Sequence, residues 1–234
     1  MKIKLPYNRL LNKNFFKLVD ESLNRFISDN ISGGRILDLG CGYGSLVHHL
    51  NRIKGNRAIG IDLDEESISV AKKLFPDESF SLATLDHNIE SNSFNYVILR
   101  DVLHHLKEDN LEKVIFEQIK RILKKDGKII IFDPNVNLVL RISRKIMRHV
   151  DAECTFKEAL TILKSSNYIV VKTDFTELFA LPLSGGYVGI CFVPRILTIQ
   201  YILIFINRLF SRIISHTFLK KYILWRYLIV AKPI

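Results

Sequence analysis

The chain has 234 residues, of which 48% are hydrophobic and 25% are charged, enough to build one α/β domain with a buried core. With 15 Phe and 8 Tyr but only 11 Gly and 6 Pro, its composition excludes a disordered or collagen-like chain. Three widely spaced cysteines (Cys41, Cys154 and Cys191) fit neither a disulfide framework nor a zinc site. No apolar signal segment opens the sequence, so we expect a cytoplasmic protein.

The net charge of +10 lies almost entirely in the second half of the chain. Residues 1–135 hold 20 Lys and Arg against 19 Asp and Glu, whereas residues 136–234 hold 14 against 5. No acidic residue follows Glu177. The first half is therefore typical of a neutral soluble domain, and the second half is expected to meet anions.

Strands and helices alternate through the first 135 residues. A helix is predicted over 9–30, where apolar residues recur at helical spacing before Gly33 and Gly34. Apolar strands are predicted at 35–39, 57–63, 79–85, 94–100 and 128–132, with helices at 45–52, 64–75 and about 111–122. Five short apolar strands separated by helices predict a parallel sheet covered on both faces, a Rossmann-like three-layer α/β fold.

The last hundred residues depart from this alternation. Residues 136–150 predict a basic amphipathic helix, and the capping box from Thr155 to Glu158 opens another helix that ends near residue 166. Two more strands are predicted at 168–174 and 223–231, separated by a long apolar insertion at about 178–219. We expect one domain over 1–234, made of an N-terminal helical segment (1–34), a ligand-binding core (35–135) and a substrate half (136–234).

The segment from Ile36 to Gly44, ILDLGCGYG, carries the sharpest chemical signal. A strand runs into three alternating glycines, which allow a tight turn and the close approach of a ligand. A dinucleotide fingerprint would have a sixth-position glycine where this chain has Ser45, and no Walker lysine follows. The carboxylate of Asp38, just before the first glycine, would repel a phosphate and suits a cationic ligand.

Two more carboxylates end predicted strands. Asp62 lies 22 residues after Gly40, where an acidic side chain accepts hydrogen bonds from both hydroxyls of a ribose. Asp86 ends the third strand, where it would accept from an exocyclic amine. Taken alone, any one of these carboxylates is better explained as a helix N-cap or a solvated turn. All three at the carboxyl edge of one sheet favour a shared ligand.

The order of these segments resembles the class I S-adenosylmethionine-dependent methyltransferases, strongly over residues 30–135 and loosely over 150–234. LDLGCGYG, GIDLD, LATLDH, SFNYVILRDVLHHL and ILKKDGKIIIFDPN resemble successive family motifs. The resemblance implies a seven-stranded sheet whose last strand is antiparallel, and S-adenosylmethionine as cofactor. It implies cofactor contacts from Asp38 (methionyl amine), Gly40, Cys41, Gly42 and Gly44 (glycine loop), Asp62 (ribose), Leu63 (adenine), and Asp86 with His87 (adenine amino group).

Arg100, the last residue of the fourth strand, departs from the family pattern, which often has a small or amide residue there. Its guanidinium is predicted either to bind the carboxylate of the cofactor or an acidic group of the substrate, or to form a salt bridge with a neighbour such as Asp101.

Candidate catalytic residues follow the fourth strand. Asp101, His104 and His105 stand at i, i+3 and i+4, near the expected position of the methyl group. If the acceptor carries a proton, His104 or His105 is the predicted general base. A divalent metal at this spacing and simple packing of one histidine are the alternatives, and we predict no resident metal. Asp133, after the fifth strand, faces the substrate or caps the turn at Pro134.

The apolar insertion allows several interpretations. The uncharged run 196–207 is shorter than the ~20 residues that cross a bilayer, and a span over 188–207 would have to carry Pro194 and Arg195. The favoured interpretation is a lid over a pocket for a small or lipophilic, possibly lipid-linked, acceptor. Peripheral contact with an anionic membrane, shared with the basic helix at 139–150, is the second interpretation, and ordinary core is the third. Long aliphatic runs among the cations argue against nucleic acid.

The predicted function is therefore S-adenosylmethionine-dependent methyl transfer, in the cytoplasm or at the inner membrane surface. The alternative is a catalytically inactive cofactor-binding or membrane-associated interaction protein with the same fold. A dehydrogenase is a weaker enzymatic alternative. The oligomeric state is left open.

Overall fold

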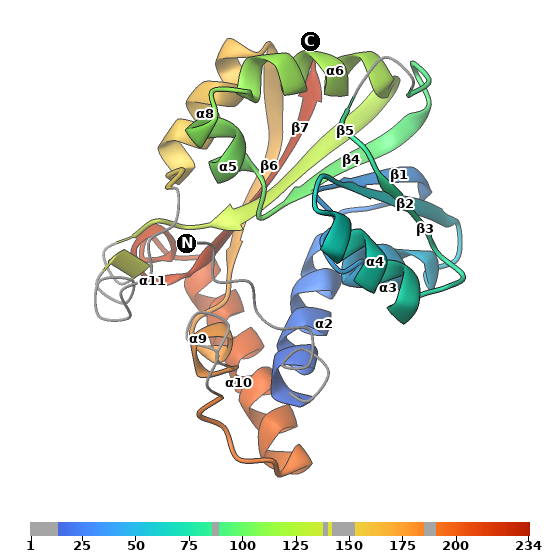
Figure 1. The fold of residues 1–234 in the computed structure, drawn as a ribbon. Coiled ribbons are helices and arrows are strands. Elements are labelled where there is room, and N and C mark those ends of the chain that lie inside the picture. Colours follow the sequence, from blue (N-terminus) through green and yellow to red (C-terminus); the bar gives the residue numbers. More distant parts are fainter. Residues whose placement is uncertain (1–13, 86–88, 138–139, 142–152, 185–190) are drawn as a thin grey trace.

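A computed structural model describes residues 14–85, 89–137, 140–141, 153–184 and 191–234. Seven strands form one sheet in the order β3-β2-β1-β4-β5-β7-β6, in which only β7 is antiparallel to its neighbours. The strands are β1 (Gly34–Leu39), β2 (Asn56–Asp62), β3 (Ser79–Leu82), β4 (Phe94–Arg100), β5 (Leu123–Pro134), β6 (Tyr168–Thr176) and β7 (Arg226–Pro233). The predicted sheet with its antiparallel last strand is confirmed (Figure 1).

Helices cover both faces of the sheet. One layer consists of α2 (Asn14–Ser28), α3 (Ser45–Asn51) and α4 (Glu65–Leu74), and the other of α5 (Leu103–Glu108), α6 (Glu112–Ile122) and α8 (Phe156–Ser165). The capping box of Thr155 and Glu158 opens α8 as predicted. This arrangement is the expected three-layer sandwich.

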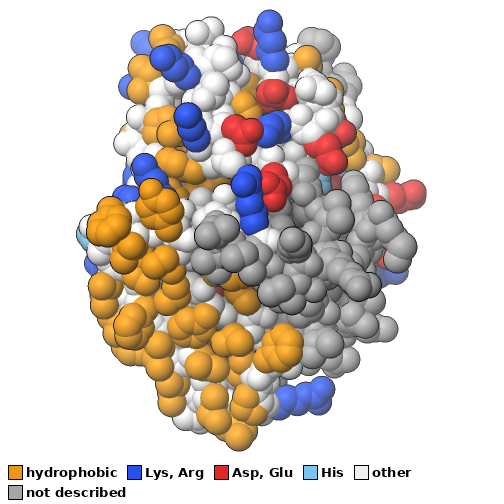
Figure 2. Space-filling model, turned by 90° about the vertical axis from the view of Figure 1, so that its left-hand side faces the viewer, with side chains coloured by type: hydrophobic (Ala, Val, Ile, Leu, Met, Phe, Trp, Pro, Cys, Tyr) orange, Lys and Arg blue, Asp and Glu red, His pale blue; other side chains and the backbone are white. Residues whose placement is uncertain are grey.

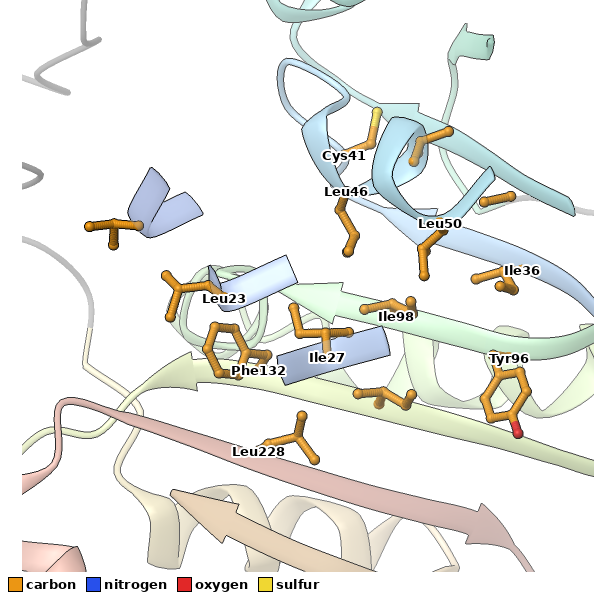
Figure 3. Close-up of a cluster of buried hydrophobic side chains, with 14 of the residues drawn as sticks. Leu23, Ile27, Ile36, Cys41, Leu46, Leu50, Tyr96, Ile98, Phe132 and Leu228 are labelled. Atoms are coloured by element: carbon orange, nitrogen blue, oxygen red, sulfur yellow. The ribbon is translucent and has the colours of Figure 1, made fainter. Parts of the chain in front are cut away.

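The core divides into two clusters because successive strand residues point to opposite faces. Ile36, Ile98 and Ile130 pack toward α2 and α3, whereas their chain neighbours Leu37, Leu99 and Ile131 pack toward α6 and α8. Figure 3 shows the first cluster, in which Leu23 and Ile27 of α2 and Leu46 and Leu50 of α3 lie over the sheet. Strands that are apolar on both faces fit a sheet buried on both sides.

Three predicted boundaries were wrong. β3 ends at Leu82 rather than 85, and β5 begins at Leu123 because Leu123 pairs with Phe94 across a register shift. The last strand starts at Arg226, since residues 220–223 form a helical turn, α11 (Lys220–Ile223). The predicted basic helix at 136–150 lies largely outside the described residues.

The apolar insertion contains two helices, α9 (Ala180–Ser184) and α10 (Leu197–Ser215). Asn207 of α10 fastens them to the sheet: its Oδ1 accepts the backbone N–H groups of Leu178, Phe179 and Ala180 at 3.1, 2.9 and 3.2 Å. Its Nδ2 donates to Glu177 Oε2 at 3.1 Å. Because β6 ends at Thr176, this pair of helices stands at the carboxyl edge of the sheet.

The glycine loop gives a stability prediction. Gly44 has φ of 80°, and a Cβ there would lie 2.4 Å from the Phe80 ring, whereas Gly42 has φ of 51° and no atom within 4 Å of its Cβ position. We expect Gly44→Ala to lower the free energy of unfolding by about 3 kcal/mol, since backbone strain and overpacking combine. Gly42→Ala, with strain alone, should cost about 1 kcal/mol. Urea unfolding measures both, and equal losses would contradict the packing argument.

Candidate active site

The glycine loop after β1 is hydrogen-bonded to the end of β2, next to the point between β1 and β4 where the strand order reverses. The backbone N–H groups of Gly40 and Cys41 both donate to Ile61 O, at 2.8 and 3.0 Å. Asp62 Oδ2 accepts the N–H of Gly42 at 2.7 Å, and its Oδ1 accepts the N–H of Asp64 at 2.9 Å. Asp62 therefore fixes the loop and the start of the next helix together. This carboxyl edge is where open α/β sheets bind ligands.

Asp38 is the most unusual group of the site. It is 1% exposed, and its Oδ1 has no hydrogen-bond partner among the residues that the structure describes. Burial raises the pKa of Asp38 to about 7; the charge of Arg100 opposes the rise and that of Asp62 adds to it. A buried carboxylate with an unmet oxygen is costly, so this position favours a ligand that brings a cationic donor.

The glycines shape the space around this carboxylate. A Cβ at Gly40, where φ is 76°, would lie 2.5 Å from Val102 Cγ2, so the loop approaches the segment after β4 closely. Gly42 instead borders open space. Leu63, beside Asp62, is 72% exposed and presents an apolar surface next to the ribose-binding candidate. The structure thus brings together Asp38, Gly40, Gly42, Gly44, Asp62 and Leu63.

The side chain of Cys41, another predicted cofactor contact, is buried in the core. Cys41 is buried with its Sγ against the position that a Gly60 Cβ would occupy, and burial raises the pKa of its thiol. Its backbone N–H is held by the hydrogen bond to Ile61 O. Asp86 and His87 lie outside the described residues.

Arg100 is engaged by α2, a partner that the sequence did not reveal. Its Nη2 contacts Asp20 Oδ1 at 2.5 Å, and its Nη1 donates to Asn24 Oδ1. Asp101, the neighbour predicted as a salt-bridge partner, lies at 4.0 Å from Arg100 Nε. A contact between Arg100 and a ligand carboxylate stays a prediction. The ligand would have to share the guanidinium N–H groups with Asp20 and Asn24 of α2.

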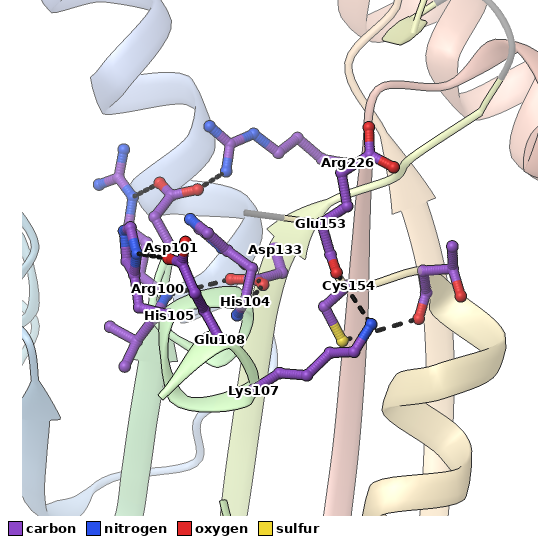
Figure 4. A network of polar contacts seen from close by, with 12 residues as sticks. Arg100, Asp101, His104, His105, Lys107, Glu108, Asp133, Glu153, Cys154 and Arg226 are labelled. Atoms are coloured by element: carbon purple, nitrogen blue, oxygen red, sulfur yellow. Dashed lines mark hydrogen bonds and ion pairs between the residues drawn. The ribbon is translucent and has the colours of Figure 1, made fainter. Parts of the chain in front are cut away.

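Asp101 has a second cationic partner that the sequence analysis missed. Its backbone has φ of 59°, and its Oδ1 accepts a hydrogen bond from Arg226 Nη1 of β7 (Figure 4). Burial acts to raise the pKa of Asp101, but Arg226 and Arg100 outweigh it and hold the pKa below its ordinary value. The available signal was the single cation in the apolar run ILWRYLIVA, because a charge inside a buried strand needs a partner.

His104 and Asp133 form a buried pair beside this network. His104 Nδ1 lies 2.9 Å from Asp133 Oδ2, and the same carboxylate accepts the backbone N–H groups of His104 and Val102, both at 3.1 Å. Burial raises the pKa of Asp133, and the hydrogen bond from His104 opposes that rise. The hydrogen bonds of Asp133 thus go to the segment after β4, where its carboxylate orients His104, and not to a cap at Pro134; that Asp133 faces the substrate stays a prediction.

His105 differs from its neighbour in exposure. Its side chain is 42% exposed, its ring centroid lies 4.2 Å from that of His104, and its Nδ1 lies 4.0 Å from Glu108 Oε2. Across the described residues, no three His, Cys, Asp or Glu side chains are grouped to hold a metal ion.

Comparison with known proteins places this site in a family. Residues 37–131 match the family described as "Methyltransferase domain", over the same segment that carries the glycine loop, Asp62 and the histidines. Residues 37–131 are therefore a methyltransferase domain of the class I S-adenosylmethionine-dependent kind.

Two curated relatives match part of this methyltransferase. Phosphoethanolamine N-methyltransferase 2 of Caenorhabditis elegans is 31% identical over 120 residues, which are 48% of this chain and 27% of the relative. The ubiquinone biosynthesis O-methyltransferase of Bradyrhizobium diazoefficiens is 29% identical over 112 residues, 46% of this chain and 42% of the relative. The match thus covers less than half of the length of either relative.

Solved structures share the fold over nearly the whole chain. A SAM-dependent methyltransferase from Archaeoglobus fulgidus aligns with a TM-score of 0.65 and 20% identity, covering 97% of this chain and 99% of that one. Geranyl diphosphate C-methyltransferase from Streptomyces coelicolor, solved with S-adenosyl-L-homocysteine, aligns with a TM-score of 0.63 and 14% identity, covering 93% and 80%. The residues of this chain fit the family's cofactor, because Asp38 offers an unmet buried oxygen to an amine and Gly42 leaves its side of the loop open.

The raised pKa of Asp38 gives a pH prediction for ligand binding. An amine binds the ionised carboxylate, and the ionised fraction falls as the pH drops below about 7. The affinity for S-adenosylhomocysteine should therefore fall about tenfold per pH unit below 7. Adenosine, which lacks the amino acid part, is the control and should bind with little dependence on pH. Titration calorimetry between pH 5.5 and 7.5 measures both, and equal slopes for the two ligands would rule out Asp38 as the amine partner.

Proposed function

We propose that this chain transfers a methyl group from S-adenosylmethionine to a small, lipophilic acceptor. The observation that carries the proposal is the buried Asp38 carboxylate, with an oxygen that lacks a partner within the described residues, at the ligand-binding edge of a methyltransferase fold. In this proposal Asp38 binds the methionyl amine and Asp62 the ribose hydroxyls. Leu63 covers the adenine, and the loop of Gly40, Cys41, Gly42 and Gly44 approaches through its backbone. Asp86, His87 and Arg100 complete the proposed cofactor contacts.

The cofactor supplies a methyl group on a positively charged sulfur, so the main task of the protein is alignment. We place His104 as the general base for an acceptor that carries a proton. Asp133 on Nδ1 favours the tautomer that carries its proton on Nδ1 and its lone pair on Nε2, the atom that would act as the base. His105, which is more exposed, is proposed to contact the acceptor.

The relatives do not determine the chemical class of the acceptor. The two curated relatives are an N- and an O-methyltransferase, and one of the similar solved structures is a C-methyltransferase. The family therefore does not determine which atom accepts the methyl group. A lipophilic acceptor is supported by the apolar helices that stand at the carboxyl edge next to the site. Work at the inner surface of a membrane would bring the enzyme to such an acceptor.

Cofactor binding tests the first part of the proposal. Asp62→Ala removes both the ribose acceptor and the anchor of Gly42, so the affinity for S-adenosylmethionine should fall at least tenfold in titration calorimetry. Asp77→Ala, which removes an exposed carboxylate away from the site, is the matched control and should bind like the wild type. Wild-type protein that releases no heat at millimolar cofactor would refute the proposed function.

Turnover distinguishes an enzyme from an inactive binding protein. Protein incubated with methyl-tritiated S-adenosylmethionine and total polar lipid should transfer label into the organic phase, and Asp62→Ala should not. Label that enters only a water-soluble metabolite pool would contradict the lipophilic acceptor. Cofactor binding without labelled product in either pool would favour the inactive alternative.

The role of His104 has a separate test. His104→Gln should lower kcat by about 100-fold or more while the Kd for the cofactor stays unchanged. Asp133→Asn should have a similar effect on kcat and should also shift the pH profile, because an amide at this position favours the opposite tautomer of His104. His48→Gln, on α3, is the control. A kcat unchanged in both site variants would exclude His104 as the base.

A further inference from the structure

The helix α10 carries its apolar side chains on the outside. Its buried residues include three polar ones, Gln200, Asn207 and Ser211, each at most 3% exposed. Its exposed residues include Leu197, Ile199, Tyr201, Ile202, Phe205, Leu209, Phe210 and Ile213, with exposed fractions from 37% to 66%. A helix on the surface of a water-soluble protein normally has the opposite arrangement. The interpretation of this segment as ordinary core is therefore wrong for its outer face.

Polar contacts hold α10 in this orientation. Asn207 binds three backbone N–H groups at the start of α9 and the carboxylate of Glu177. Gln200 Nε2 donates to Pro194 O at 3.0 Å. Turning the helix to bury its apolar face would break these buried hydrogen bonds, and each lost partner is costly. The exposed apolar face is thus built into the fold.

Neighbouring segments extend this face into a large surface, which we call the apolar surface. It consists of the eight exposed residues of α10 together with Phe192, Ile196, Phe218, Leu219 and Tyr222. Figure 2 shows hydrophobic side chains gathered over the lower part of the molecule, with Lys and Arg at their border. Contiguous apolar patches of this kind on soluble proteins mark sites of protein or membrane contact.

The charges around the apolar surface identify its partner. Arg195, Arg208 and Arg212 are exposed on the same segment, and no acidic residue follows Glu177 in the sequence. Two copies of the chain placed face to face would bring these cations together, with no acidic group from this segment to pair with them. Nucleic acid would pair with the cations but leave the aromatic and aliphatic side chains against a hydrated backbone. Anionic lipid satisfies both features.

The length of α10 permits a membrane span, but its contacts do not. With 19 residues it is, within the described residues, the one helix long and apolar enough to cross a membrane by length and composition. Crossing would strip Asn207 and Gln200 from their partners. We propose that α10 lies in the plane of an anionic membrane surface, with the apolar surface inserted among the headgroups and Arg195, Arg208 and Arg212 on lipid phosphates. Docking does not require turnover, but it would give the proposed enzyme access to a lipophilic acceptor.

Vesicle flotation of the full chain tests the proposal. The protein should float with vesicles of phosphatidylcholine and phosphatidylglycerol at 7:3 and bind vesicles of pure phosphatidylcholine far more weakly. The triple variant Ile202→Ser, Phe205→Ser and Leu209→Ser removes three side chains of the exposed face and should lower partitioning by about 100-fold or more. Arg208→Gln combined with Arg212→Gln should lower binding to anionic vesicles by about 25-fold, close to fivefold for each cation.

Controls separate docking from folding, self-association and catalysis. Val114→Ser changes a 60% exposed side chain on α6, in the other helix layer, and should float like the wild type. All variants should keep the wild-type melting temperature, because the replaced side chains are exposed. Wild-type protein that stays at the bottom with anionic vesicles overturns the proposal, as does equal binding to neutral vesicles. A wild-type dimer in light scattering that the triple variant converts to a monomer, without vesicle binding, would also overturn it. Calorimetry with S-adenosylhomocysteine on the same samples reports failure of the proposed function independently.

Discussion

The buried carboxylate of Asp38 is the constraint on which the site depends. It lies in β1, the strand from which the sheet grows in both directions, with β2 on one side and β4 on the other. The backbone on each side is fixed by strand pairing, so the carboxylate cannot turn toward solvent without disturbing the centre of the sheet. Burying this carboxylate without a partner for Oδ1 destabilises the folded protein, and a cationic ligand would offset that loss, a common arrangement at functional sites. In the proposed function, selectivity for an amine over a phosphate would follow from this one group.

Two ion pairs between segments that are distant in sequence lie beside this site. Asp20 of α2 binds Arg100 at the end of β4, and Arg226 of β7 binds Asp101. Alternating cations and carboxylates hold the ends of β4 and β7 and the helix α2 together. The segment that carries His104 begins directly after Asp101. Its geometry therefore depends on elements 80 to 125 residues away in sequence.

The sequence predicted what local patterns control and missed what tertiary pairing decides. Alternating strands and helices, with the spacing from Gly40 to Asp62, were enough to predict the sheet and the position of the ligand edge. The partners of Arg100 and Asp101 were not predictable, since no local pattern links Asp20 or Arg226 to the end of β4. The orientation of α10 was missed for another reason. Gln200, Asn207 and Ser211 share one helical face, which is ordinarily taken as the solvent side. The hydrogen bonds of Asn207 to the N–H groups at Leu178–Ala180 and to Glu177 hold that face inward, and they depend on tertiary contact.

The helix α10 and the candidate active site are connected through α2. Residues of α10 and α2 share one core cluster, which includes Ile204 of α10 and Val19 and Leu23 of α2, and α2 also supplies Asp20 to Arg100. In Figure 1 α9 follows the carboxyl end of β6 and α10 lies beside α9, so the apolar surface and the glycine loop belong to the same edge of the sheet. The helix α2 therefore packs in one core with the helix that carries the apolar surface, and it also holds the guanidinium of Arg100, whose charge acts on Asp38.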